Sequence, residues 1–395
     1  MRIFVLLSRI PYPLEKGDKL RAYHQIKVLS ENHEIILCAL NSNRKIDKQK
    51  AFSLLQPYCR SVTFVDLSLF SRVFNILLAF LKGLPFQTGY FYNAKAAKKI
   101  DQLIKQHQPE HLYGQLARTA RYLINKPLPK TIDYQDAFSH GLKRRAKHAG
   151  IFLKPVLWLE YRRMASFERF IFDQFDGKTI ISEQDKALIP HPQKESIVVV
   201  RNGVDMHYFK PMNLDKKQEI VFTGNMNYPP NIDAAQFLAK EIMPLVWKKI
   251  PHAKLLLAGA QPHAKVCRLA GKRIIVTGWL DDIRTAYAES SVFVAPMRIG
   301  TGLQNKLLEA MAMHIPTVTT PLANAALHAE NGKEILIGEQ ADDLANHLIN
   351  LLNNKLLQER IAKHAYLFVQ KNFNWKNATL PLEKLLAADA TQKTP

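Results

Sequence analysis

The sequence is poor in cysteine. Cys38, Cys59 and Cys267 are the only cysteines among 395 residues, and they lie far apart without a CxxC pair. This spacing excludes a disulfide framework and gives no sign of a structural zinc site. We therefore expect three reduced, buried thiols and a fold stabilised by hydrophobic cores.

Long hydrophobic runs are also missing. The apolar run at the amino terminus, IFVLL, ends at Ser8 and Arg9, which makes it too short for a signal-peptide core or a membrane span. We find no internal repeat and no low-complexity tract. The sequence predicts a cytoplasmic globular protein whose first residues form a buried strand.

Acidic residues are scarce relative to basic ones. The chain has 55 Lys plus Arg against 34 Asp plus Glu, a formal charge of +21. This excess favours an anionic partner, such as nucleic acid, a phosphorylated ligand or a membrane surface. Because the basic residues are dispersed and no RNP-like strand, zinc finger or basic coiled coil is present, we expect no nucleic-acid partner.

The sequence does contain a regular alternation of short β-rich runs with helical stretches, which is typical of parallel strands joined by helices. RIFVLL, EIILCAL and SVTFVDL begin a first series, and QEIVFTG, AKLLLAG, RIIVTG, SVFVAP and IPTVTT form a second. The length also favours two domains. We predict an α/β fold with a first domain over 1–195, a second over 196–368 and a carboxyl-terminal helix within 369–395.

One turn in the second series fits a phosphate. SVFVAPMRIGTGLQNKLLEAMAM predicts a strand, a glycine-containing turn and a helix that begins near Gln304. A helix amino terminus offers unpaired N–H groups and a positive dipole end, whereas an ordinary turn before a solvated helix is the alternative. The candidate donor-binding residues here are Arg298, Gly300, Thr301, Gly302, Leu303, Gln304, Asn305, Lys306 and Glu309.

These stretches, with RNGVDMHYFKP, IVFTGNMNYPPNIDAAQFL and VTGWLDDIRTAYAESSVFVAPM, resemble the glycosyltransferase family 4 group of retaining enzymes with the GT-B fold. RIPYPLEKGDKLRAYH, DYQDAFS and ISEQD look more narrowly like the sugar transferases of bacterial exopolysaccharide and exosortase (PEP-CTERM) systems. The resemblance covers nearly the whole chain. It implies two Rossmann-like domains facing a deep inter-domain cleft, with a nucleotide-diphosphate sugar held mainly by the second domain and an acceptor by the first. It also implies that the last helix crosses back onto the first domain.

The sequence departs from the family pattern in two places. Thr301 stands where the first glutamate of the E-x7-E signature belongs, while Glu309 matches the second. After Gly224, the positions at which the family often has arginine and lysine hold Asn225 and Pro230. Gly224 and Asn225 remain donor-site candidates, but the family's charge pattern is not carried over to them.

We therefore expect Arg298 and Lys306 to hold the diphosphate. Breaking the bond between sugar and phosphate builds negative charge on the leaving group, which positive groups and oriented N–H donors stabilise. The sequence has neither an evident DxD-type motif in a strand-end loop nor a compact cluster of His, Asp and Glu. We expect neither metal nor cofactor. The adjacent Asp281 and Asp282 are interpreted as helix caps.

The resemblance assigns the nucleobase to the turn after RIIVTG, where Gly278 and Trp279 lie. Trp279 either stacks on the base or packs against the protein. In the first domain, Asp136 and His140 follow a short strand and are candidates for contacting the sugar or removing the acceptor proton, with helix capping as the alternative.

The first loop and its helix provide a further candidate contact with phosphate or acceptor. It consists of Gly17, Lys19 and Arg21, which match the family's first loop; a solvated first helix turn is the alternative.

The basic excess is concentrated partly in LKRRAKH and YRR, and LSLFSRVFNILLAFLKGLPF is strongly apolar. The two features together fit an amphipathic helix on an anionic bilayer that presents a lipid-linked acceptor, or a core helix under a loop.

The sequence thus predicts a retaining glycosyltransferase that works in the cytoplasm, at the inner face of the plasma membrane. Its predicted substrates are a nucleotide sugar and a glycan or lipid-linked acceptor for surface polysaccharide. A GT-B nucleotide-sugar epimerase is the alternative, which isomerisation without an acceptor would reveal; a basic nucleic-acid-binding protein is less favoured.

Overall fold

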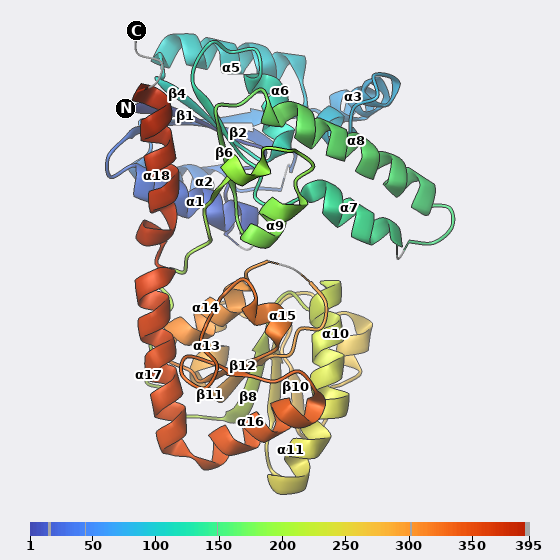
Figure 1. Ribbon diagram of the computed structural model, residues 1–395, viewed down its shortest axis with the longest axis vertical. Coiled ribbons are helices and arrows are strands. Elements are labelled where there is room, and N and C mark those ends of the chain that lie inside the picture. Colours follow the sequence, from blue (N-terminus) through green and yellow to red (C-terminus); the bar gives the residue numbers. More distant parts are fainter. Residues whose placement is uncertain (15–16, 44, 148, 301, 392–395) are drawn as a thin grey trace. The chain divides into compact units, whose positions relative to one another are not determined.

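The computed structural model describes residues 1–14, 17–43, 45–147, 149–300 and 302–391 (Figure 1). The chain divides into two compact units. Unit 1 comprises Met1–Arg201 with Thr379–Pro395, and unit 2 comprises Asn202–Ala378. The division after Arg201 lies beyond the predicted boundary at 195/196 because the short strand β7 (Val198–Val199) pairs with the sheet of unit 1.

Unit 1 is built on a seven-stranded parallel sheet in the order β3-β2-β1-β4-β5-β6-β7. The remaining strands are β1 (Arg2–Leu7), β2 (Glu34–Asn41), β3 (Ser61–Asp66), β4 (His111–Gln115), β5 (Lys130–Asp133) and β6 (Gly177–Ile180). The order reverses between β1 and β4. In open parallel sheets such a switch point is where ligands bind, at the carboxyl ends of the strands.

Helices cover both faces of this sheet, as the continuous apolar strands require. Alternate residues of β1 point to opposite faces: Ile3 and Val5 pack against α1, and Phe4 and Leu6 lie in the core that includes α5. The helices are α1 (Gly17–Leu29), α2 (Lys48–Leu55), α3 (Leu69–Leu81), α4 (Phe86–Phe91), α5 (Ala94–His107), α6 (Ala120–Leu123), α7 (Phe138–Lys147), α8 (Lys154–Phe172) and α9 (Glu183–Leu188). Short 3-10 turns lie at Gln56–Tyr58, Ala117–Thr119 and Lys194–Ser196.

Unit 2 repeats the plan with six parallel strands in the order β10-β9-β8-β11-β12-β13. The strands are β8 (Gln218–Thr223), β9 (Leu255–Ala258), β10 (Ile274–Val276), β11 (Ser290–Ala295), β12 (Thr317–Thr319) and β13 (Leu336–Ile337). Its helices are α10 (Pro229–Phe237), α11 (Met243–Lys249), α12 (Ala264–Cys267), α13 (Ile283–Ala288), α14 (Asn305–Ala312), α15 (Pro321–Asn324), α16 (Ala341–Asn353) and α17 (Lys355–Asn372); a π-helical stretch, Leu238–Ile242, precedes α11. The switch point lies between β8 and β11. The predicted α/β fold with two parallel-sheet domains is thereby confirmed.

The last helix, α18 (Trp375–Thr391), returns the chain to unit 1, where Leu382 and Leu386 are buried in the core beside α1. The three cysteines are free, but only Cys38 is buried, Cys59 is half-buried and Cys267 is exposed. The expectation of three buried thiols was therefore wrong for Cys267, because α12 is a short surface helix.

Candidate active site

Glycines allow close approach of backbone and side chains at the carboxyl end of β8. Gly224 has φ +150° and Gly259, after β9, has φ +141°. A Cβ atom on Gly224 would lie 2.7 Å from Asn231 Nδ2 and 3.1 Å from Lys306 Nζ. The Lys306 ammonium therefore sits directly over the end of β8, at the switch point of the sheet.

Lys306, on the first turn of α14, carries a buried ammonium group. Its Nζ donates a 2.5 Å hydrogen bond to Asn231 Oδ1 on α10 and lies 4.6 Å from the centre of the Phe222 ring. Burial lowers the pKa of Lys306 to about 7, and Glu309 offsets only part of that effect. A buried ammonium with a neutral amide as its hydrogen-bond partner would be stabilised by an anion that reached it.

Glu309, one turn further along α14, is held by residues from two other elements. Tyr287 on α13 is fully buried; its hydroxyl donates to Glu309 Oε2 at 2.7 Å and lies 2.7 Å from Thr223 Oγ1 on β8. Burial raises the pKa of Glu309, while Tyr287 and Lys306 oppose that rise. Tyr287 therefore fixes the direction of the Glu309 carboxylate.

The turn before α14 brings backbone N–H groups toward the same edge. Gly300 and Gly302 have φ +113° and +82°, conformations that favour glycine. Gln304 occupies the N-cap position without a side-chain capping bond, and its Nε2 donates to Gly302 O at 3.3 Å instead. The amino terminus of α14 thus keeps its capacity to bind an anion.

Three other predicted residues of this turn have separate positions. Leu303 is half-buried against the core of unit 2. Asn305 Oδ1 lies 3.5 Å from Nδ2 of the buried Asn202. Thr301 lies outside the described residues.

Arg298 was expected to hold the diphosphate, but its guanidinium is paired with carboxylates. Its guanidinium lies across Asp233, with Nε and Nη2 at 3.1 and 2.9 Å from the carboxylate oxygens, and Nη1 is 3.5 Å from Glu241. The hydrogen bond with Asp233 raises the pKa of Arg298 despite some desolvation. The predicted pairing of Arg298 with Lys306 on one ligand is not what these contacts provide, because two carboxylates already neutralise the guanidinium.

Two further turns follow β10 and β8, the strands on either side of β9. After β10, Gly278 has φ +74° and its carbonyl accepts from Gly259 N at 3.2 Å, while the exposed Trp279 donates from Nε1 to Asp281 at 3.2 Å. After β8, the Asn225 carbonyl accepts from Asn231 Nδ2 at 2.9 Å. These contacts join the turn of Asn225 to the residue that holds Lys306.

Asp282 caps α13, as predicted: its side chain accepts from Arg284 N at 3.0 Å.

In unit 1, Arg21 was predicted to contact phosphate or acceptor, but it is buried. Its Nε donates to Asp133 Oδ2 at 2.7 Å and its Nη1 to Val200 O at 2.7 Å. Burial opposes the charge, but Asp133 outweighs it and raises the pKa of Arg21. Arg21 is a structural residue that ties α1 to β5, and its burial removes it from a ligand-binding loop. Lys19 donates to Tyr12 O at 2.6 Å, and Gly17 begins α1.

Asp136 lies between β5 and α7, and His140 lies on the first turn of α7. Asp136 is exposed to solvent, yet the protein around it desolvates its carboxylate. This desolvation, to which the charge of Asp185 adds, raises the pKa of Asp136 to about 6. His140, on α7, faces the edge of Tyr161 at 6.5 Å, and desolvation with Lys143 and Arg144 lowers its pKa. The raised pKa of Asp136 brings this carboxyl group closer to neutral pH, as an acid–base residue requires.

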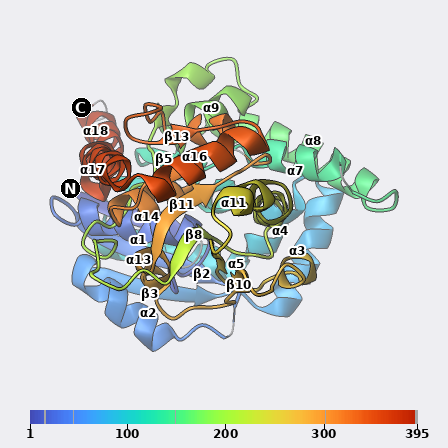
Figure 2. The ribbon, with the colours of Figure 1, turned by 90° about the horizontal axis from the view of Figure 1, so that it is seen from below.

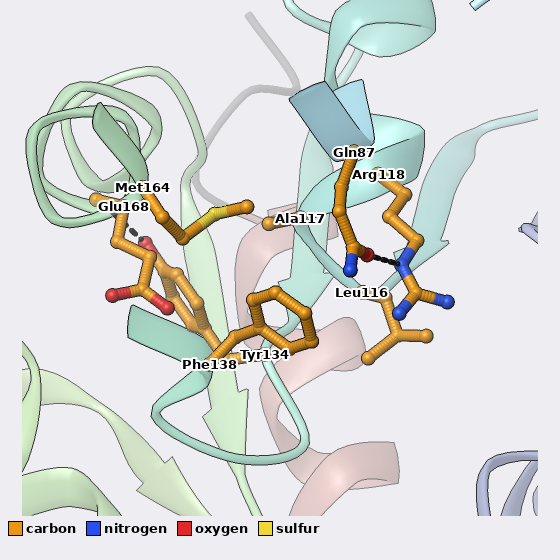
Figure 3. A pocket seen from close by; sticks show the side chains of 8 residues that line it. All are labelled: Gln87, Leu116, Ala117, Arg118, Tyr134, Phe138, Met164 and Glu168. Atoms are coloured by element: carbon orange, nitrogen blue, oxygen red, sulfur yellow. Dashed lines mark hydrogen bonds between the residues drawn. The ribbon is translucent and has the colours of Figure 1, made fainter. Parts of the chain in front are cut away.

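Glu168, a fully buried carboxyl group on α8, was not predicted from the sequence (Figure 3). It accepts from Ser139 N at 3.1 Å, and burial raises its pKa to about 7. It lines a small cavity of about 10 Å³ with Met164 and Phe138. Its place inside the unit gives it a packing role behind the Asp136 loop.

A larger pocket, about 300 Å³, lies at the carboxyl ends of β1, β2 and β4. Arg118 lies between the rings of Phe91 and Phe138, at 4.8 and 5.4 Å, and its Nε donates to Gln87 Oε1 at 2.8 Å (Figure 3). Desolvation, then the charge of Arg9, lowers the pKa of Arg118 to about 10. The lining residues are Arg9, Ser42, Phe86, Gln87, Tyr90, Phe91 and Arg118. Two guanidinium groups and three aromatic rings suit a sugar-like body with an anionic group.

Within the part of the chain that the structure describes, no three His, Cys, Asp or Glu residues are grouped to hold a metal ion. The same described part contains no helix long and apolar enough to cross a membrane.

Comparison with known proteins relates part of unit 2 to glycosyl transferases. Residues 217–354 match the family described as glycosyl transferases group 1. A relative from Klebsiella pneumoniae, called an uncharacterized 44.6 kDa protein in the cps region, is 24% identical over 392 residues, covering 95% of this chain and 97% of that protein.

Solved structures show the fold. Sucrose-phosphate synthase from Thermosynechococcus elongatus matches with a TM-score of 0.71 at 14% identity, over 100% of both chains. HepE from Anabaena in complex with UDP-glucose matches with 0.69 at 14% identity, over 98% of this chain and 99% of that one. A TarM variant from S. aureus in complex with fondaparinux, α-GlcNAc-glycerol and UDP gives 0.68 at 12% identity, over 98% and 99%. The chain therefore has the GT-B fold, and the match to the group 1 glycosyl transferases lies within unit 2.

Proposed function

We propose that the protein is a retaining glycosyltransferase that moves a sugar from a nucleotide-diphosphate sugar to a glycan or lipid-linked acceptor in the synthesis of a bacterial surface polysaccharide. One observation carries the donor site: the buried Lys306 ammonium over the end of β8, bonded to the neutral Asn231 and close to the uncapped start of α14. The cps-region relative and the UDP-glucose complex of HepE support the polysaccharide and the donor class.

Lys306 and the amino terminus of α14 would receive the diphosphate. As the bond between the sugar and the diphosphate breaks, negative charge builds on the departing oxygen, and fixed positive groups in a water-poor site stabilise it. Glu309, whose carboxylate Tyr287 orients, would accept hydrogen bonds from ribose hydroxyls. Retention of the anomeric configuration rests on the family resemblance, and we expect transfer to need neither metal nor cofactor.

On the acceptor side, Asp136 and His140 would contact the sugar and take the proton of the acceptor hydroxyl. The raised pKa of Asp136, about 6, suits a base that works near neutral pH. The pocket beside Arg9 and Arg118 would hold the acceptor body. We expect the enzyme to work in the cytoplasm at the inner face of the membrane.

Thermal unfolding with a panel of nucleotide diphosphates and their sugars tests the donor site. A ligand that binds only the folded protein raises its melting temperature by mass action. We expect one nucleotide to stabilise the wild-type protein and to lose this effect in Lys306→Ala and Glu309→Ala. Lys363→Ala, which changes an exposed lysine on α17, is the matched control.

The proposal would be contradicted if no nucleotide of the panel raised the melting temperature of the wild-type protein. Sugar isomerisation without acceptor would point to an epimerase instead. For the donor that binds, NMR of the anomeric proton of the product tests retention, and transfer in the presence of EDTA tests metal independence.

A further inference from the structure

Helix α3 is oriented with its apolar stripe toward solvent. Phe70 is 84% exposed and Leu81 71% exposed. The exposed residues recur at the spacing of one helix face: Leu69, Phe70, Val73, Phe74, Leu77, Phe80 and Leu81. Soluble helices normally bury this stripe.

The polar side chains of α3 face the protein instead. Arg72 is buried and donates from Nη1 to Tyr90 Oη at 2.6 Å and to Ser42 O at 3.2 Å. Asn75 Nδ2 donates to Tyr92 O at 2.8 Å. These bonds fix the helix with its apolar side outward, so the exposure follows from the fold of unit 1.

A second apolar group lies at the connection between α7 and α8. Phe152 is 94% exposed, and Ile151 and Leu153 beside it are exposed as well. Val156 and Leu159 continue the stripe along the first turns of α8 and are also exposed.

The two groups lie on the same side of unit 1, as both ribbon views show (Figures 1 and 2). Arg163 on α8 lies over the ring of Phe80 on α3, 4.9 Å from its centre. Glu160 on α8 accepts from Phe86 N at the start of α4 at 2.8 Å, and Phe80 stacks on Phe86. We call the exposed apolar residues of α3 together with 151–153, Val156 and Leu159 the apolar surface.

The two segments that carry the apolar surface contain basic residues and no acidic ones. The sequence has no Asp or Glu from Leu67 to Asn93, nor from Ala137 to Leu159. The basic residues of these segments, other than the buried Arg72, are exposed or half-buried: Lys82, Lys143, Arg144, Arg145, Lys147 and Lys154. Two copies of this surface facing each other would bring like charges together, whereas an anionic bilayer attracts each of them.

We propose that the apolar surface docks unit 1 on an anionic membrane. Helix α3 lies in the plane of the interface with Phe70, Phe74 and Leu77 among the acyl chains, and Phe152 at the α7–α8 connection forms a second anchor. The lysines and arginines contact the lipid phosphates. This is the geometry of a helix that lies on a bilayer, and it requires no membrane-spanning segment.

Co-sedimentation of the full-length protein with vesicles tests the docking. We expect binding to phosphatidylcholine vesicles that contain phosphatidylglycerol, and at least tenfold weaker binding to phosphatidylcholine alone. Phe70→Asp with Phe152→Asp should weaken binding to the anionic vesicles by about tenfold or more, because each removes a large apolar side chain from the acyl region. Arg144→Gln with Arg145→Gln should weaken binding several-fold and reduce its dependence on salt.

The matched control is Leu356→Asp, which removes an exposed leucine from α17 of unit 2 and should leave vesicle binding unchanged. Circular dichroism and thermal stabilisation by UDP should be the same in all variants, because none touches the proposed donor site. This readout distinguishes failure of docking from failure of the proposed transfer reaction.

Absence of wild-type binding to the anionic vesicles would overturn the proposal. So would concentration-dependent dimerisation, measured by sedimentation velocity, that Phe70→Asp abolishes while vesicle binding persists; the apolar surface would then be an interface between copies.

Discussion

Each of the two units contains a buried cation near the carboxyl end of a strand of its sheet, Arg21 in unit 1 and Lys306 in unit 2, and these two cations have opposite kinds of partner. Arg21 in unit 1 meets the Asp133 carboxylate at 2.7 Å, and Tyr113 and Thr179 also bond that carboxylate. Lys306 in unit 2 meets the neutral amide of Asn231. Both residues are buried, so burial alone does not identify a functional group.

The pKa values separate the two cations. Despite its burial, the pKa of Arg21 is raised, because Asp133 compensates its charge. Burial lowers the pKa of Lys306 to about 7, because its surroundings compensate less. A protein that only needed stability would gain by replacing such a lysine with an apolar residue. The arrangement at Lys306 is suited to an anion that arrives with the ligand.

The largest expected effect is on stability, at Arg21. Arg21→Met leaves the Asp133 carboxylate buried without its cation, and we expect a loss of about 3–5 kcal/mol of unfolding free energy. Urea denaturation measures it. Adding Asp133→Asn to the same chain should recover part of the loss, because the buried charge is gone. If Arg21→Met unfolds like the wild type and fails only in acceptor binding, Arg21 is a ligand residue and the comparison breaks.

Lys306→Met should give the reverse pattern. We expect kcat to fall by about 10²–10³-fold, the usual effect of removing one group that stabilises transition-state charge. The unfolding free energy should stay equal or rise, because methionine fills the space without the cost of burying an ammonium. Steady-state kinetics and urea denaturation of the same preparation check both halves. A destabilised but fully active Lys306→Met would make Lys306 a structural residue.

Much of the fold and the position of Lys306 and Glu309 could be predicted from the sequence, and the predictions that failed did so for physical reasons. The strands follow from continuous apolar runs, and Lys306 with Glu309 follows from a glycine turn before a helix. Their partners Asn231, Tyr287 and Thr223 were missed because they come from other elements of unit 2 and only the fold brings them together. Arg21 was misjudged because its partner Asp133 is 112 positions away.

The orientation of α3 could not be derived from the sequence. Its apolar stripe can be found by periodicity, but a stripe does not say whether it faces the core or the solvent. That depends on the contacts of Arg72 and Asn75 with α4 and the loops beside it.

Tyr287→Phe should have a smaller effect than Lys306→Met. The change removes the hydroxyl that donates to Glu309 and lies against Thr223, and leaves a buried carboxylate without this donor. We expect about 1–3 kcal/mol less unfolding free energy. Donor affinity, measured by calorimetry, should fall by up to about tenfold, which corresponds to 1.4 kcal/mol. Tyr208→Phe, at a surface tyrosine of unit 2, is the control. An unchanged donor affinity in Tyr287→Phe would mean that Glu309 needs no orienting bond.

The mildest perturbation changes only the pH and no residue. The folded pKa of Lys306, about 7, lies below its ordinary value of 10.5, so the unfolded chain binds more protons between these values. For the free protein, this group makes the unfolding free energy rise as the pH rises from about 7. A bound diphosphate favours the charged ammonium, so nucleotide affinity should fall as the pH rises above about 7, by up to about tenfold per pH unit. Calorimetry in buffers of different ionisation enthalpy should detect proton uptake on binding in the wild type and less of it in Lys306→Met. Equal proton uptake in both proteins would assign the titration to another group, and Lys306 would then be as fully compensated as Arg21.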